Sequence, residues 1–140
     1  MEERILGPAV LLCGFGPDAR AAALRSWLRE NSIRVIDVRQ PDYDRPIGAV
    51  LDLPGFPDGA VPPSGGSADG EMLVMFGFRG GMLDALLGFF RREKLAPVAL
   101  KAMATPTNLF WSARQLYHEL SREHAMFERQ KAARAAGNGG

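Results

Sequence analysis

A strand–helix–strand pattern that occurs twice is the feature that most limits how this chain folds. Residues 9–13 form a short apolar run ended by Gly14, a helical pattern follows to about residue 30, and residues 33–38 form a second apolar run. The same order returns later in the chain, in residues 72–76, 81–94 and 97–101. A strand, a helix and a strand within about 30 residues predict a βαβ unit with a right-handed crossover. We therefore expect two βαβ halves.

The two halves also resemble each other in sequence. Shifting residues 9–38 by 63 positions without a gap gives seven identities, among them Gly14 with Gly77 and Leu24 with Leu87. Because the identities fall at strand ends and on helix faces, they favour a structural duplication. Two βαβ halves predict an α+β fold, a ferredoxin-like sandwich with helices on one face of one sheet and an added C-terminal helix. The alternative is a small α/β doubly wound sheet.

The length of 140 residues fits one domain, which we place at residues 1–127. Its halves are residues 9–53 and 71–120, and a Gly/Pro-rich joint, residues 54–70, connects them. Pro46 and Pro54 bracket Ile47–Leu53, which we expect to add an edge strand. The last helix is expected to begin near Thr105. Residues 128–140 are polar and basic, and we expect them to form a frayed tail.

Composition excludes several classes of function. The net charge is +1, so no general attraction to nucleic acid or to an anionic membrane is expected. The single cysteine, Cys13, forms no internal disulfide and predicts a reducing compartment, and we expect a cytoplasmic protein. His118 and His124 are six residues apart, which places them on different faces of a helix, so we expect no metal site. No cofactor is predicted.

The segment before the last helix is the best candidate for a binding site. Thr105 and Pro106 suit the N-cap and first position of a helix, whose free amides attract an anion. Lys101 would add a positive charge, and Thr107, Asn108 and Trp111 would add polar groups and a flat wall. We therefore predict ligand-binding residues Lys101, Thr105, Thr107, Asn108 and Trp111 for a small anionic metabolite. The same residues also suit a capped helix with a core tryptophan and no ligand.

A weaker candidate is the turn after the first strand. Residues 14–19 match the spacing G-x-G-x-x-A, and Asp37 ends the next strand where a ribose-binding carboxylate would stand. Gly14, Gly16 and Asp37 are the cofactor-binding residues that a nucleotide site would use here. Asp18 would bring a negative charge to the same helix start, which opposes a pyrophosphate. The alternative interpretation is a tight turn with a solvated Asp37.

Several segments resemble a bacterial family of small proteins known as domain of unknown function 3783. Its signature resembles Thr105-Pro-Thr-Asn108 followed by Trp111. Residues 40–48, with Asp42-Tyr43, and the strand at residues 71–75 followed by Gly77-Phe78 resemble earlier parts of the family. The resemblance covers the chain to about residue 127. It implies that the residues of the predicted anion site belong together, and it implies no reaction.

The sequence as a whole favours a small ligand-binding or regulatory protein without catalysis of its own. No Ser, His and Asp set follows a catalytic motif, so no catalytic residue is predicted. One alternative is a protein–protein interaction module that forms a homo-oligomer through the open edge of its sheet. A second alternative is a nucleotide-binding protein that uses residues 14–19.

Overall fold

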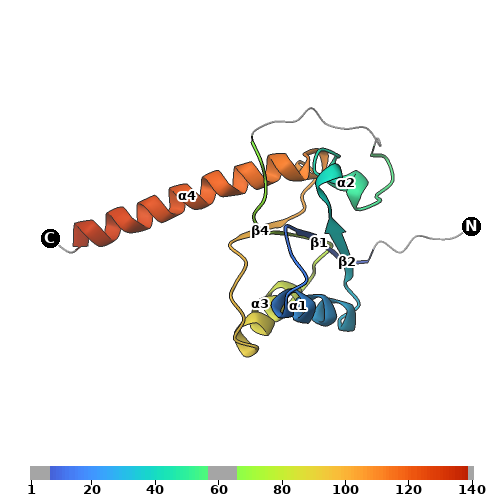
Figure 1. The fold of residues 1–140 in the computed structure, drawn as a ribbon, viewed down its shortest axis with the longest axis horizontal. Coiled ribbons are helices and arrows are strands. Elements are labelled where there is room, and N and C mark those ends of the chain that lie inside the picture. Colours follow the sequence, from blue (N-terminus) through green and yellow to red (C-terminus); the bar gives the residue numbers. More distant parts are fainter. Residues whose placement is uncertain (1–6, 57–65, 139–140) are drawn as a thin grey trace, which may run out of the picture.

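The computed structural model describes residues 7–56 and 66–138, and within them the chain forms one mixed sheet with helices on both sides (Figure 1). The strands are β1 (Ala9–Cys13), β2 (Arg34–Val38), β3 (Met72–Phe76) and β4 (Leu100–Met103). The α-helices are α1 (Ala19–Glu30), α2 (Ile47–Val50), α3 (Met82–Arg92) and α4 (Ala113–Asn138). Two 3₁₀ turns, η1 (Gln40–Asp42) and η2 (Asn108–Phe110), complete the elements. The mixed α/β fold class is therefore confirmed.

The strand order β2-β1-β3-β4 shows how the two halves join. Strands β1 and β2 are parallel, β3 and β4 are parallel, and β1 pairs with β3 in antiparallel register. Each half is thus a βαβ unit whose two strands are direct neighbours, with α1 or α3 as the crossover helix. In this respect the sheet resembles the doubly wound alternative. The connection between α1 and β2 spans residues 31–33, whereas that between α3 and β4 spans residues 93–99.

The internal repeat has a structural counterpart. Leu11 lies opposite Val74 in the antiparallel pair, and these two residues are also 63 positions apart. An approximate two-fold axis at this pair therefore relates the halves. Gly14 and Gly77 follow β1 and β3 with φ angles of +77° and +73°, a conformation that favours glycine. Because both strand ends have this backbone conformation, the two halves share a glycine there.

The sheet separates two cores, because alternate residues of β1 and β3 face opposite sides. On one side Val10 and Leu12 pack with α1 and α3, and this is the α1–α3 core. On the other side Leu11 and Val74 pack with α2, the loop residue Tyr43 and the first turns of α4, and this is the α4-side core. Figure 1 shows α1 and α3 below the sheet and α2 and α4 above it. The prediction of helices on one face therefore holds for α1 and α3 only.

The edge strand expected at Ile47–Leu53 is wrong, because Ile47–Val50 forms the short helix α2. Ile47 and Leu51 are four residues apart and both fully buried, which is helical spacing. Pro46 stands at the N-cap, where it starts the helix without needing a hydrogen bond from its nitrogen. Of the expected joint, residues 57–65 lie outside the described residues.

The last helix begins at Ala113 instead of near Thr105, because the chain carries two capping boxes in succession. Thr105 N–H donates to Asn108 Oδ1 at 2.8 Å and Asn108 N–H donates to Thr105 Oγ at 3.0 Å, but only the turn η2 follows. Ser112 and Gln115 form the same reciprocal pair of bonds, at 2.9 and 3.1 Å, and start α4. The sequence Ser112-Ala-Arg-Gln115 contains this signal, and the prediction missed it.

The tail expected to fray is helical through residue 138, as the final turns of α4. Alanine, lysine, arginine and glutamine dominate residues 129–136, and all four have high helix propensity. Figure 1 shows these turns extending away from the rest of the molecule. None of the described helices has the length and apolar character needed to cross a membrane.

Candidate functional site

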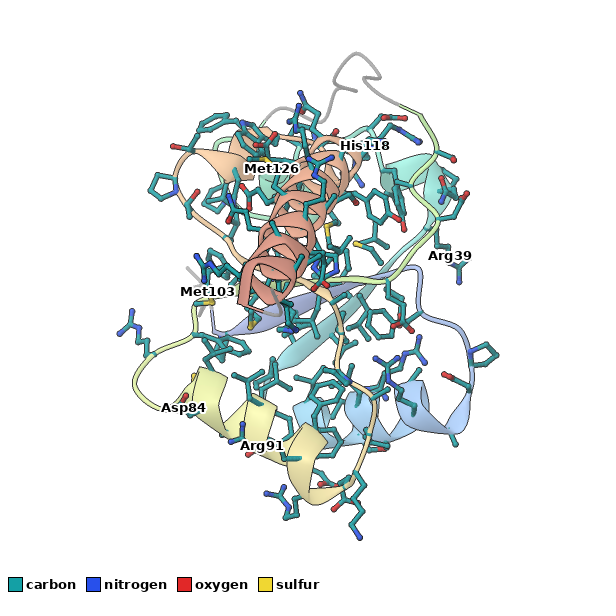
Figure 2. All side chains as sticks on the ribbon, turned by 90° about the vertical axis from the view of Figure 1, so that its left-hand side faces the viewer. Arg39, Asp84, Arg91, Met103, His118 and Met126 are labelled. Atoms are coloured by element: carbon teal, nitrogen blue, oxygen red, sulfur yellow. The ribbon has the colours of Figure 1, made fainter. Side chains whose placement is uncertain are left out.

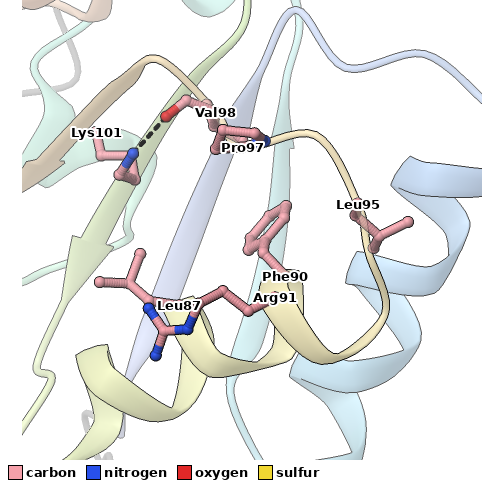
Figure 3. A pocket seen from close by; sticks show the side chains of 7 residues that line it. All are labelled: Leu87, Phe90, Arg91, Leu95, Pro97, Val98 and Lys101. Carbon is pink, nitrogen blue, oxygen red and sulfur yellow. Dashed lines mark hydrogen bonds between the residues drawn. The ribbon is translucent and has the colours of Figure 1, made fainter.

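A small cavity lies between α3 and β4, on the side of the α1–α3 core (Figure 3). Its volume is about 200 Å³. Five of its lining residues are apolar and two are cationic: Leu87, Phe90, Leu95, Pro97 and Val98, with Arg91 and Lys101. The long connection between α3 and β4 supplies Leu95, Pro97 and Val98, so this connection forms one wall.

The Lys101 side chain enters this cavity because of its position on β4. Lys101 lies opposite Leu73 in the β3–β4 pair, and Leu73 belongs to the α1–α3 core. Its neighbours Leu100 and Ala102 point to the other side of the sheet and pack on the α4-side core. The Lys101 ammonium donates to the carbonyl oxygen of Val98, which leaves two of its three N–H donors for a ligand.

Arg91 brings a second positive charge to the cavity from the facing helix. It lies in the last turn of α3, where a cation also interacts favourably with the helix dipole. Figure 3 shows Arg91 on α3 below the cavity and Lys101 on β4 above it. Within the described residues neither side chain forms an ion pair with a carboxylate. The two charges therefore face a mostly apolar space without a described acidic partner.

Arg20 holds the wall of the cavity in place from α1. Its guanidinium donates to the carbonyl oxygens of Ala96 at 2.8 Å and Pro97 at 3.2 Å, and it forms an ion pair with Glu71 at 2.8 Å. The ring of Phe90 lies 5.9 Å from its charged carbon. The helical pattern places Arg20 on the solvent side, yet its side chain is only 17% exposed. No local sequence signal connects residues 76 positions apart.

The residues predicted for the anion site are separated by the fold. Lys101 lies on the α3 side of the sheet, whereas Trp111 packs partly buried against the α4-side core. Thr105 and Thr107 are exposed, and helix α4 begins beyond them. Lys101 is therefore not brought together with the other four residues, because side chains of β4 alternate between two faces and α4 starts eight residues later than expected.

Asn108 has a structural role in this segment. Its side chain is 8% exposed, and it accepts from Thr105 N–H and donates through Nδ2 to the carbonyl oxygen of Met103 at 3.1 Å. Ala104 N–H donates to Met75 of β3, so by strand alternation the Met103 carbonyl points to the outer edge of β4. Asn108 thus closes this edge of the sheet at Met103.

The turn after β1 is held by side chains of the protein itself. Asp18 caps α1 by accepting from Ala21 N–H at 3.2 Å. Arg25 forms an ion pair with Asp37 at 2.7 Å and donates to the carbonyl oxygen of Gly16. This pair also raises the pKa of Arg25, through its hydrogen bond to Asp37. The carboxylates at this turn therefore already have partners, and one of them stands at the helix start.

The α4-side core contains two buried acids that stay protonated at neutral pH. Burial raises the pKa of the Cys13 thiol to about 12 and that of the Tyr43 hydroxyl to about 12. Arg114 lies over the Tyr43 ring at 5.9 Å and pairs with Asp44 at 2.8 Å. A protonated thiol at a position without solvent access is a poor nucleophile. In the residues the structure describes, no three metal-binding side chains gather in one place.

The geometry defines an α/β protein of two βαβ halves with a small cationic cavity in its second half. Residues 71–127, which include β3, α3, β4 and the start of α4, match the model of a domain of unknown function, DUF3783. The match supports the resemblance for this part of the chain, and it covers both Lys101 and Thr105–Trp111. No curated protein and no solved structure matches the chain.

Proposed function

We propose that this protein binds a small organic anion with an apolar body in the cavity between α3 and β4. The observation that carries the proposal is the pair of cationic groups, Lys101 and Arg91, on an otherwise apolar lining. Arg91 is exposed and Lys101 is half-buried, so both cations are accessible to an anion that enters from solvent. A carboxylate at this place would accept from both side chains while its body contacts Leu87, Phe90 and Val98.

The volume limits the size of the ligand. A cavity of about 200 Å³ equals the volume of about seven water molecules at the ~30 Å³ each takes in the liquid. A short branched-chain or aromatic monocarboxylate fits that space. The five apolar lining residues favour such a body over a sugar or a nucleoside, whose hydroxyl groups would lose hydrogen bonds to water.

Binding without catalysis is the role that the lining supports. Apart from Lys101 and Arg91, the lining residues carry no ionisable or nucleophilic group. The proposal moves the expected anion site from the start of the last helix to the cavity, and Lys101 is the residue that the two share. The single cysteine still predicts a reducing, cytoplasmic setting for such a binding protein.

Isovalerate, benzoate and inorganic phosphate are suitable probes, tested by methyl NMR and thermal shift. We expect the two carboxylates to move the methyl resonances of Leu87, Leu95 and Val98 in a saturable way, and phosphate to move them less. A ligand at ten times its dissociation constant adds about 1.4 kcal/mol of stability. Carboxylates that leave these resonances unchanged would contradict the proposal.

Two adjacent arginines provide a matched control. Arg91→Gln and Lys101→Gln are expected to weaken carboxylate binding by about tenfold each. Arg92→Gln removes the same charge from the next residue, which does not line the cavity, and should bind like the wild type. Equal weakening by Arg91→Gln and Arg92→Gln would indicate general electrostatic attraction instead of a site.

The geometry gives less support to the two alternatives from the sequence, which are an oligomer through the sheet edge and a nucleotide site at residues 14–19. Pairing through the edge of β4 would have to displace the hydrogen bond that Asn108 donates to the Met103 carbonyl. A nucleotide at residues 14–19 would have to displace the cap formed by Asp18 and the pair formed by Arg25 and Asp37. Both costs favour the cavity as the binding site.

A further inference from the structure

Helix α4 extends far beyond the part of the molecule that covers it. Its first turns are buried at Ala113 and Leu116, whereas every residue from 122 to 137 is exposed. At 1.5 Å per residue this uncovered part is about 25 Å long. Figure 1 shows it projecting from the sheet, and Figure 2 shows the side chain of Met126 on it. A helix of this length is marginal in water without tertiary contacts.

The uncovered part carries two large apolar side chains. Phe127 is 61% exposed and Met126 is 49% exposed. A groove of about 230 Å³ between β4 and α4 contains Ala99, Leu100, Leu120 and Phe127 in its lining. Phe127 therefore continues the surface that Leu120 presents to the body of the protein.

Several residues that recur about every seven positions lie on one face of α4. We call it the α4 stripe, and its members line two adjacent grooves: Leu120, Glu123, His124, Phe127, Gln130, Lys131 and Arg134. Leu120, Phe127 and Arg134 are seven residues apart, and Glu123 and Lys131 each lie four residues from Phe127. Residues at these spacings share one face of a helix.

The charges of the α4 stripe match a second copy in antiparallel orientation. If two stripes cross at Phe127, Glu123 of each helix faces Lys131 of the other helix, because both lie four residues from the crossing point. This gives two complementary pairs in one symmetric contact. Parallel pairing would instead place Glu123 against Glu123. The antiparallel arrangement also places the uncovered end of each helix on the groove that contains Ala99 and Leu100 of the other copy.

We propose that the α4 stripe is the interface of a symmetric dimer, in which two α4 helices cross in antiparallel orientation at Phe127. Phe127 is the apolar anchor of the contact, and the Glu123–Lys131 pairs set its orientation. The partner is a second copy of this chain. Lys101 lines both the groove and the anion cavity, but Phe127 and Lys131 do not line the cavity, so variants at these two positions test the dimer separately.

Sedimentation velocity and light scattering over a range of concentrations test this proposal. The wild type is expected to change from the mass of one chain to that of two as concentration rises, and Phe127→Asp to remain a monomer. Because Phe127 is exposed, far-UV circular dichroism should show that the variant keeps its fold. A wild type that stays a monomer at all concentrations, or a dimer unaffected by Phe127→Asp, would overturn the proposal.

A charge swap tests the orientation. Lys131→Glu places like charges together and is expected to weaken the dimer by about tenfold, and the double variant Glu123→Lys, Lys131→Glu should restore it. Arg129→Glu is the matched control, because it makes the same change of charge two residues from Phe127, on the opposite side of the helix. Equal effects of Lys131→Glu and Arg129→Glu, or no rescue by the double variant, would contradict antiparallel pairing.

Discussion

Replacing Asn108 by alanine tests whether this residue holds the loop before α4 together or serves a ligand. The side chain makes two hydrogen bonds, from Thr105 N–H at 2.8 Å and to the Met103 carbonyl at 3.1 Å. A neutral hydrogen bond in a protein contributes about 1 kcal/mol to stability. We therefore expect Asn108→Ala to lower the free energy of unfolding by about 2 kcal/mol, which is about 5–8 °C in Tm for a domain of this size.

Urea denaturation followed by far-UV circular dichroism measures this loss. Asn108→Asp keeps an acceptor for Thr105 N–H but places a carboxylate oxygen against the Met103 carbonyl oxygen in a side chain that is 8% exposed, so at neutral pH a loss at least as large as that of Asn108→Ala is expected. Thr107→Ala is the control, because Thr107 is exposed and lies in the same turn, and its change should stay within about 0.5 kcal/mol. If Asn108→Ala also stays within about 0.5 kcal/mol of the wild type, the structural role assigned to Asn108 is refuted.

Three further predictions follow from glycine geometry, buried acids and the cavity wall. Gly14→Ala should destabilise the protein by about 2 kcal/mol or more, since its Cβ would collide with the backbone oxygen of Gly70 at a φ of +77°. Gly16→Ala, whose Cβ would meet nothing within 4 Å, should be nearly neutral, and urea titrations compare the two variants. Because burial raises the pKa values of Cys13 and Tyr43 from 9.0 and 10.0 to about 12, the stability they provide is complete below pH 9 and is lost as pH rises toward 12. Denaturation at several alkaline pH values should show that the free energy of unfolding falls with rising pH. This fall should be shallower in Cys13→Ala by up to about 1.4 kcal/mol per pH unit, and an unchanged fall would count against a buried, protonated thiol. Arg20→Gln should lower stability by about 2 kcal/mol and broaden the NMR signals of residues 95–98, and unchanged signals would show that Arg20 does not fix the wall.

The two βαβ halves were predictable because their signals are local. Apolar runs ended by Gly14 and Gly77, with helical spacing between them, depend only on residues close in sequence. The position of α4 was not predictable from the cap at Thr105, since Ser112 provides a second cap of equal quality. Contacts made by the rest of the fold decide between them. The Trp111 carbonyl accepts from Ile47 N–H at 2.8 Å, which holds Trp111 extended and ends the first turn.

The candidate site was predictable only in part. Lys101 was selected from the sequence, but its surroundings depend on which face of β4 it occupies and on which helix covers that face. In the sequence, Arg91 is an ordinary cation in the last turn of a helix, and its position does not mark it as a site residue. Arg20 acts through carbonyl groups 76 and 77 positions away, and no pattern of neighbouring residues encodes such a contact.

The unequal connections in the two halves explain how the second half acquires its cavity. The three residues between α1 and β2 leave little length for such a wall, whereas the seven between α3 and β4 allow Leu95, Pro97 and Val98 to stand away from the helix as a wall. A chain built from two copies of one unit can lengthen a loop in one copy while the other copy keeps the shared sheet intact. On the proposed function, variation in residues 93–99 would change the ligand without loss of the fold.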